Sequence, residues 1–168
     1  MSKKAYKMKQ ASASMHTGID KDVRKTGAEA LSITLANSYM LYLKTQNYHW
    51  NVTGPEFHQL HLLFEAQYRD LFEAIDTIAE RIRALGIYAP GTFKQFAELS
   101  TIKEESEIPK SRQMIENLMN DNETLIEQAR EVAELAEDNK DGATADLMIS
   151  RMAAHEKNAW MLRSLIQR

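Results

Sequence analysis

The sequence predicts an all-α protein, a four-helix bundle with one long crossover connection. Only three prolines and six glycines interrupt the 168 residues, too few for the many turns of an all-β fold. Apolar residues recur at steps of three and four along four long segments, which is the spacing of a helix face. Short turns follow the first and third segments, whereas a long connection joins the second to the third, so that these two run parallel.

The first two helices are predicted to form an antiparallel hairpin. The first begins near Asp20 or Asp22, either of which can cap it, and its stripe continues to His49. The turn NVTGP follows, and its Pro55 occupies a position where helices often begin. The second helix carries an apolar seam along its whole length and ends at Gly86, in the usual manner of a helix C-terminus.

The crossover and the second hairpin complete the prediction. A structureless loop over residues 86–108 would be unusual in a compact domain, so we expect a short helix at about Phe93–Leu99. The third long helix runs from about Pro109 to Glu137, and the fourth follows the turn AEDNKDG and reaches the C-terminus. Residues 21–168 then form one ferritin-like four-helix bundle, since that fold has one long crossover.

The charge divides the chain into a basic tail and an acidic body. Residues 1–19 contain Lys3, Lys4, Lys7 and Lys9 and no acidic residue. The remaining residues hold 17 basic and 24 acidic side chains, a net charge of −7. We expect residues 1–20 to form a flexible tail, because the segment is too polar to pack. Such a tail is either an interaction segment or an inert solvated terminus.

The composition also excludes several classes of function. Cysteine is absent, which removes disulfide frameworks, zinc–thiolate and iron–sulfur sites and cysteine nucleophiles. A cysteine-free chain agrees with a reducing compartment, and we expect a cytoplasmic location, nucleoid-associated if DNA is bound. No apolar run approaches the roughly 18 residues that a membrane span needs, so no membrane partner is expected.

The residues with metal-binding chemistry gather around the first turn and along the second helix. They lie in HWNVTGPEFHQLHLLFE and AIDTIAE and are His49, His58, His61, Glu65, Asp76 and Glu80. His61 and Glu65 are four residues apart, as are Asp76 and Glu80, so each pair shares one helix face. The pairs are separated by about 16 Å along the axis. One ion cannot contact both pairs of one chain, because metal–ligand bonds are about 2 Å long.

Two interpretations of these pairs remain open from the spacing alone. In the first, Asp76 and Glu80 pair with arginines such as Arg83 on a solvated face, and the histidines are incidental. In the second, the helix packs antiparallel on its own copy across a two-fold axis, which brings the His61 end of one chain against the Asp76 end of the other. Imidazole and carboxylate ligands without sulfur suit iron or manganese, and also zinc.

Longer stretches of the sequence resemble the Dps family, the mini-ferritins that protect DNA in starved or oxidatively stressed bacteria. The similarity is carried by LYLKTQNYHWNVTGPEFHQLHLLFEAQY, DTIAERIRALG and APGTFKQFAELSTI. LMISRMAAHEKNAWML also resembles the family's last helix, so the match covers most of residues 25–168. The long motif and its strict spacing favour the second interpretation.

The resemblance implies a dodecameric hollow shell with ferroxidase sites at two-fold dimer interfaces. The family's ligands correspond here to His49, His61 and Glu65 from one chain and Asp76 and Glu80 from its partner. Glu65 stands where some members have Asp, and the additional methylene is expected to preserve ligation. Trp50 matches a tryptophan beside the family's site, where it either intercepts radicals or serves as an aromatic packing plug.

The activity implied is oxidation of Fe(II) to Fe(III), preferably by hydrogen peroxide, followed by storage of ferric oxide in the shell. Iron is therefore the expected metal, with zinc or manganese as substitutes. Asp141, Asp146 and Glu156 either line an iron-entry pore or are solvated surface residues. The alternative function is sequence-independent DNA binding and compaction through the lysine-rich tail. His58 receives no role, and His155 is expected to be a core histidine.

Overall fold

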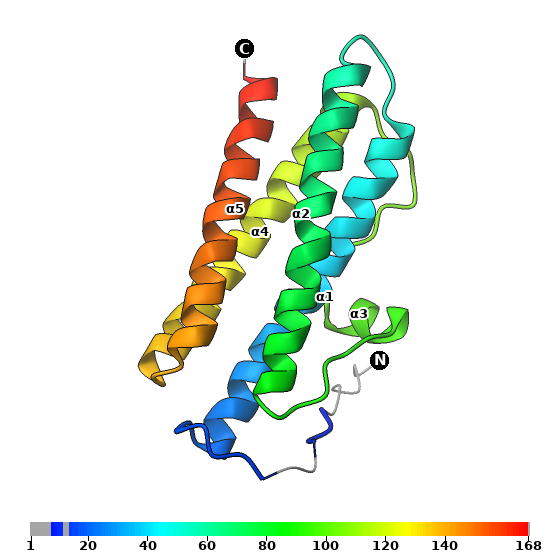
Figure 1. Cartoon of the computed structure of the whole chain (residues 1–168). Helices are drawn as coiled ribbons and strands as arrows, with labels where there is room; N and C mark the ends of the chain where they lie inside the picture. Colours follow the sequence, from blue (N-terminus) through cyan, green and yellow to red (C-terminus); the bar gives the residue numbers. More distant parts are fainter. Residues whose placement is uncertain (1–7, 12–13, 168) are drawn as a thin grey trace.

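The computed structural model describes residues 8–11 and 14–167, and these fold into four long helices and one short one (Figure 1). The elements are α1 (Lys21–Asn51), α2 (Phe57–Ala84), α3 (Phe93–Leu99), α4 (Ser111–Asp138) and α5 (Gly142–Ile166). No β-strand occurs within the described ranges, and the predicted all-α bundle is confirmed. The short crossover helix has its predicted bounds, whereas α2 begins two residues after Pro55.

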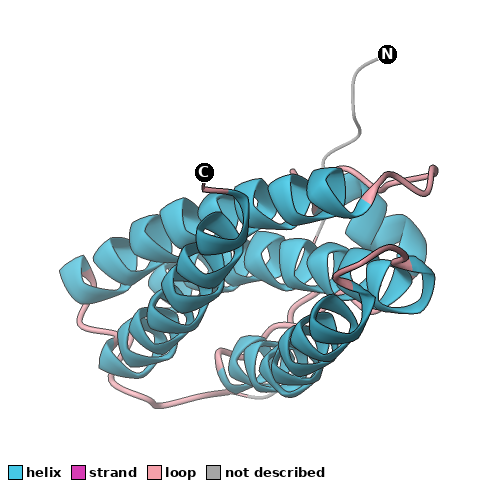
Figure 2. Ribbon diagram, turned by 90° about the horizontal axis from the view of Figure 1, so that it is seen from above, coloured by secondary structure: helices cyan, strands magenta, loops and turns pink. Residues whose placement is uncertain are grey.

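The connectivity of the bundle is the predicted one. α1 and α2 run antiparallel, as do α4 and α5, and the crossover returns along the bundle before α4 begins (Figure 1). As a result α2 and α4 point in the same direction (Figure 1). Viewed from above, the long helices are grouped around a common centre (Figure 2). The long crossover is thus the feature that distinguishes this bundle from one with short turns throughout.

Helix ends follow local side-chain chemistry at α3, at α5 and after α2. The Thr92 hydroxyl accepts from the Gln95 N–H, and the Gln95 side chain accepts from the Thr92 N–H, which is a capping box for α3. Asp141 caps α5 by accepting from the Thr144 N–H at 3.1 Å. The turn after α2 uses Gly86, whose φ of 87° lies in the left-handed region that glycine adopts without steric strain.

The apolar core determines which residues of α2 point outward. Leu60 and Phe64 are buried in one core cluster, with exposed fractions of 1% and 0%. Burial of such a side chain stabilises the fold by about 1.5–3 kcal/mol, so this rotation of α2 is strongly specified. His61 and Glu65 follow these residues by one position, about 100° round the helix. The core therefore directs both ligand candidates to the edge of the bundle.

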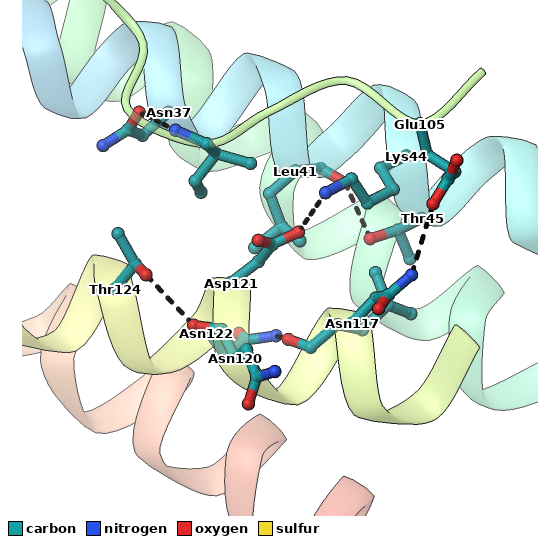
Figure 3. A network of polar contacts seen from close by, with 12 residues as sticks. Asn37, Leu41, Lys44, Thr45, Glu105, Asn117, Asn120, Asp121, Asn122 and Thr124 are labelled. Atoms are coloured by element: carbon teal, nitrogen blue, oxygen red, sulfur yellow. Dashed lines mark hydrogen bonds and ion pairs between the residues drawn. The ribbon is translucent and has the colours of Figure 1, made fainter. Parts of the chain in front are cut away.

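Asn37 attaches the crossover to the bundle, within a polar network between α1, the crossover and α4 (Figure 3). Its Oδ1 accepts from the Ser100 hydroxyl at 2.7 Å and from the N–H groups of Thr101 and Ile102 at 2.8 and 3.2 Å. Its Nδ2 donates to the Thr101 hydroxyl and to Gln128. The fully buried Asn37 side chain thus forms hydrogen bonds with the polar groups at the point where the crossover leaves α3.

A second part of the same network joins α1 directly to α4. Lys44 Nζ lies 2.6 Å from Asp121 Oδ2, and Asn117 Nδ2 donates to Glu105 of the crossover at 3.4 Å (Figure 3). Burial raises the pKa of Asp121, although the hydrogen bond from Lys44 acts in the opposite direction. The crossover is consequently a packed part of the bundle.

The described part of the N-terminal segment is also attached to the bundle. An isolated antiparallel bridge and two backbone hydrogen bonds of 2.9 and 3.0 Å join residues 9–11 to residues 86–88. Met8 packs against a core cluster. Backbone hydrogen bonds and an apolar side chain therefore hold residues 8–11 against the bundle, and the flexible tail over residues 1–20 stays a prediction. Lys3, Lys4 and Lys7 lie outside the described residues.

Candidate metal centre

His49 near the end of α1 and His61 in the second turn of α2 stack face to face. Their ring centroids are 3.8 Å apart and their planes are inclined by 20°. The intervening turn spans only residues 52–56, so the two helix ends are held side by side. His49 is 7% exposed and His61 is half-buried. The pair therefore lies at the boundary between the core and the surface.

Each imidazole is held by the backbone of the other histidine. His49 Nδ1 lies 2.8 Å from the His61 carbonyl oxygen, and His61 Nδ1 lies 2.9 Å from the His49 carbonyl oxygen. Because a carbonyl oxygen can only accept, both Nδ1 atoms are donors and carry the proton. In a neutral imidazole the lone pair is then on Nε2. This is the arrangement in which protein histidines bind metals, with the other ring nitrogen bonded to a backbone carbonyl.

Glu65 lies one turn beyond His61 on the same side of α2. Its Oε1 accepts two hydrogen bonds from Arg69, from Nε at 2.9 Å and from Nη2 at 2.6 Å. The Arg69 guanidinium lowers the pKa of Glu65, and the nearby His49 and His61 act in the same direction. Glu65 is therefore an ionised carboxylate one turn beyond His61, held by Arg69 and not gathered with the two histidines into a three-residue site within the described part of one chain. Sequence reasoning did not include Arg69, although its four-residue step from Glu65 is the signal for such a pair.

Asp76 and Glu80 lie one turn apart further along α2, both exposed. Within residues 8–11 and 14–167 neither carboxylate has a hydrogen-bond or ion-pair partner. The proposed pairing with Arg83 is not formed, since that guanidinium donates to the Ile87 carbonyl at 3.1 Å and lies 4.2 Å from the centroid of the Tyr88 ring. No three His, Asp or Glu side chains in the described part of one chain gather into a metal site.

Aromatic side chains flank the histidine pair. The Phe57 ring centroid lies 5.3 Å from that of His61, and the Tyr68 centroid lies 5.2 Å from that of His49 in an edge-to-face contact. Seam spacing alone predicts core packing for Tyr68 and does not place it beside the histidines. Trp50 is 63% exposed, so it is not an internal packing plug of the isolated chain.

The comparisons with known proteins identify the family of the chain. Residues 28–168 match the ferritin family model, described as a ferritin-like domain. DNA protection during starvation protein 2 of Bacillus anthracis is 35% identical over 144 residues, which cover 86% of this chain and 99% of that protein. The chain belongs to the Dps family. A low-temperature-induced protein of a Nostoc strain is 41% identical over 155 residues, covering 91% of this chain and 87% of that protein.

Solved structures of Dps proteins have the same fold. The Dps protein of Vibrio cholerae O1, described as a member of a broad superfamily of ferritin-like diiron-carboxylate proteins, superposes with a TM-score of 0.89 at 34% identity. That match covers 95% of this chain and 100% of the other. Dps of Bacillus brevis gives a TM-score of 0.85 at 33% identity, over 91% of this chain and 100% of the other.

The three pore candidates of this Dps-family chain have different surroundings. Asp141 is only 5% exposed, and its Oδ1 lies 2.5 Å from Arg81 Nη2. This contact and the α5 cap engage the Asp141 carboxylate inside the chain, and a pore role for Asp141 stays a prediction. Glu156 is exposed and pairs with Arg130 at 3.1 Å. Asp146 is exposed on the first turns of α5, and a pore role for it stays a prediction.

The other histidines differ clearly from the stacked pair. His155 is 1% exposed, with Nδ1 2.8 Å from Asn122 Oδ1 and Nε2 3.4 Å from Arg151 Nη2. Burial, followed by the charge of Arg151, lowers the pKa of His155 to about 3. His155 is thus placed in the core, as expected, whereas His58 is exposed and has no side-chain partner among the described residues. Among these residues, none of the helices is both long and apolar enough to span a bilayer.

Proposed function

We propose that this Dps-family protein is a ferroxidase and iron store. It oxidises Fe(II) to Fe(III), preferably with hydrogen peroxide, and retains ferric oxide inside a shell of twelve subunits. The observation that carries this proposal is the reciprocal pair of Nδ1–carbonyl hydrogen bonds, which leaves both Nε2 atoms available as ligands. A role in protecting DNA agrees with the name of the Bacillus anthracis relative.

The complete centre, on this proposal, forms between two copies of the chain related by a two-fold axis. One copy contributes His49, His61 and Glu65, and the other contributes Asp76 and Glu80. Antiparallel packing of α2 on its own copy closes two equal centres, because an isologous interface repeats every contact. Phe72, which lies between the two ligand pairs, is 61% exposed and gives this face of α2 an apolar group to bury. The unpartnered carboxylates and this exposed ring support α2 as the dimer face.

The residues then have separate chemical roles. The Nε2 atoms and carboxylate oxygens bind Fe(II), and manganese or zinc fits the same donors. Hydrogen peroxide accepts two electrons, so two Fe(II) ions held close together reduce it, with two protons, to two water molecules. No hydroxyl radical is released on this route. The acidic body, with a net charge of −7 over residues 20–168, attracts the cation.

An anaerobic Fe(II) titration of the assembled protein, followed by one addition of hydrogen peroxide, tests the proposal. Ferric absorbance should rise roughly 100-fold more slowly in His61→Ala than in wild type, because a ligand is lost. His58→Ala is the matched control, since His58 lies on the same helix, is exposed and has no side-chain partner among the described residues. Equal rates in the two variants would overturn the assignment of the site.

The basic N-terminal segment supports a second candidate function, sequence-independent DNA binding. Its lysines oppose the negative charge of the body, and twelve copies on one shell would act together. Binding of this kind weakens linearly in log affinity against log salt, because each neutralised phosphate releases a counterion. A gel-shift series from low to high salt tests it. Absence of any shift at low salt would leave the protein without this function.

A further inference from the structure

Arg69 lies on α2 between two carboxylates, one turn after Glu65 and one turn before Glu73. Its guanidinium donates both observed hydrogen bonds to Glu65 Oε1. Glu73 is exposed, and its side chain has no partner among the described residues. Arg69 and Glu73 line the same surface cavity, about 550 Å³ in volume. The arginine therefore has an occupied position and a vacant one within reach.

The order of these residues along the helix explains which position is occupied. A carboxylate four residues before a basic side chain pairs better than one four residues after it, because the helix dipole favours the first order. Glu65 precedes Arg69, and Glu73 follows it. Glu65 is thus the preferred partner while no cation is present.

A divalent cation beside the histidine pair would reverse this preference. It attracts the carboxylate of Glu65 and repels the guanidinium that is bound there. Exposed ion pairs at this spacing are weak, so a metal ion displaces the arginine readily. We propose that Arg69 is a two-position counter-ion, which neutralises Glu65 in the empty site and moves to Glu73 when a divalent metal ion binds. This inference rests on the proposed metal function of the site.

Within one chain, the surroundings leave Glu73 as the receiving partner. Asp70, the other carboxylate of the same cavity, is already paired with Arg151 at 2.7 Å. The Tyr68 ring lies 5.9 Å from the Arg69 guanidinium carbon and offers an aromatic face to the cation. The change of partner needs only side-chain rotation, because all three groups project from one helix. Arg69 is therefore a positioning residue that sets the metal affinity through Glu65.

Calorimetric titration of the assembled protein with Co(II), used as an air-stable substitute for Fe(II), measures this effect directly. Arg69→Gln should tighten Co(II) binding by roughly three- to tenfold, since it removes both a competing ion pair and a repelling charge. Arg112→Gln is the matched control, because Arg112 and Glu116 form an ion pair of the same spacing on α4, at 3.1 Å. Equal affinities in the two variants would overturn the counter-ion role.

A second variant tests the receiving position. Glu73→Gln removes it and should weaken Co(II) binding by about two- to threefold, the opposite sign to Arg69→Gln. In the Arg69→Gln background the same change should have little further effect, because the coupling passes through Arg69. A simple attraction between Glu73 and the cation predicts equal losses in both backgrounds. That result would refute the two-position model.

Different results would refute the metal site and the counter-ion role of Arg69. Wild-type protein that does not bind Co(II), or whose binding is unaffected by His61→Ala, would remove the metal site itself. Binding that depends on His61 but is identical in Arg69→Gln and wild type would retain the site and remove the counter-ion.

Discussion

His61 in the α1–α2 hairpin and His155 in the α4–α5 hairpin make the same kind of contact through Nδ1 and differ in the surroundings of Nε2. Nδ1 of each donates to an oxygen, at 2.9 Å for His61 and 2.8 Å for His155. The remaining nitrogen of His155 faces Arg151 in the core, whereas that of His61 has no hydrogen-bond partner among the described residues. The position of the second nitrogen therefore separates a structural histidine from one available as a ligand.

Ion pairs join the two helices of the α4–α5 hairpin, whereas two ligand candidates on α2 have no such partner among the described residues. Across α4 and α5, Arg130 pairs with Glu156 at 3.1 Å, and Arg163 pairs with Glu123. On α2, by contrast, Asp76 and Glu80 are exposed without partners within the described ranges. The proposed centre uses these two unpaired carboxylates as ligands toward a second copy of the chain.

The largest expected effect follows from completing that centre with a second copy. His61→Ala and Asp76→Ala should each slow peroxide-driven iron oxidation by roughly 100-fold. Mixed shells of the two variants should regain part of the activity, because a dimer with one copy of each has one intact and one doubly broken centre. Light scattering should give a particle near twelve times 19.2 kDa throughout. No recovery despite proven mixing would overturn the shared centre between two copies.

Replacing the histidine of the other hairpin, His155, by alanine should lower stability and leave iron oxidation almost unchanged, which is the opposite of the effect expected for His61→Ala. His155→Ala leaves a cavity and removes a partner from buried Asn122, so the free energy of unfolding should fall by about 2–4 kcal/mol. Its rate of iron oxidation should stay close to that of wild type. His61→Ala should lose less than about 1 kcal/mol. Denaturant unfolding at matched protein concentration measures both, and equal losses of stability would abolish the distinction between the two histidines.

A smaller effect is the loss of folding stability at acidic pH that follows from the buried His155. The pKa of His155 is about 3 in the folded chain against an ordinary value of 6.5. Between these values the unfolded chain binds a proton that the folded chain does not, so stability falls as the pH drops below 6.5 and levels off near 3. At pH 5 the loss is about 2 kcal/mol. Unfolding at pH 7 and pH 5 should show this loss in wild type and not in His155→Leu; an equal loss in both would assign it to other groups.

Much of the fold is predictable because its signals are local. The short helix Phe93–Leu99 has its predicted bounds because Thr92 and Gln95 form a capping box within the same few residues. The attachment of residues 8–11 is different, since it depends mainly on backbone hydrogen bonds to residues 86–88, which side-chain chemistry does not encode. Only Met8, apolar within a polar stretch, marks it in the sequence.

The candidate site is predictable in its residues but not in its contacts. The four-residue spacing places His61 and Glu65 on one face, and this follows from helix geometry alone. Which ring nitrogen of His61 is free depends on its hydrogen bond to the His49 carbonyl across the turn, and the spacing of the residues does not predict this contact. The burial of Asp141 against Arg81 depends likewise on how α2 and α5 pack. The sequence therefore identifies the side chains that carry metal-ligand atoms. The packing of the helices decides which of these atoms are free to bind a metal ion.

The smallest expected effect concerns two parts of the N-terminal segment, residues 2–7 and residues 8–11. Deletion of residues 2–7 leaves Met8 and the contacts of residues 9–11, so the free energy of unfolding should change by less than about 0.5 kcal/mol. Deletion of residues 2–11 removes these contacts and should lower it by about 1–2 kcal/mol. If the lysines bind DNA, both deletions should lose the gel shift at low salt and leave iron oxidation unchanged. A shift retained by the shorter deletion alone would assign DNA binding to Lys9, and equal destabilisation would show that residues 2–7 also contact the bundle.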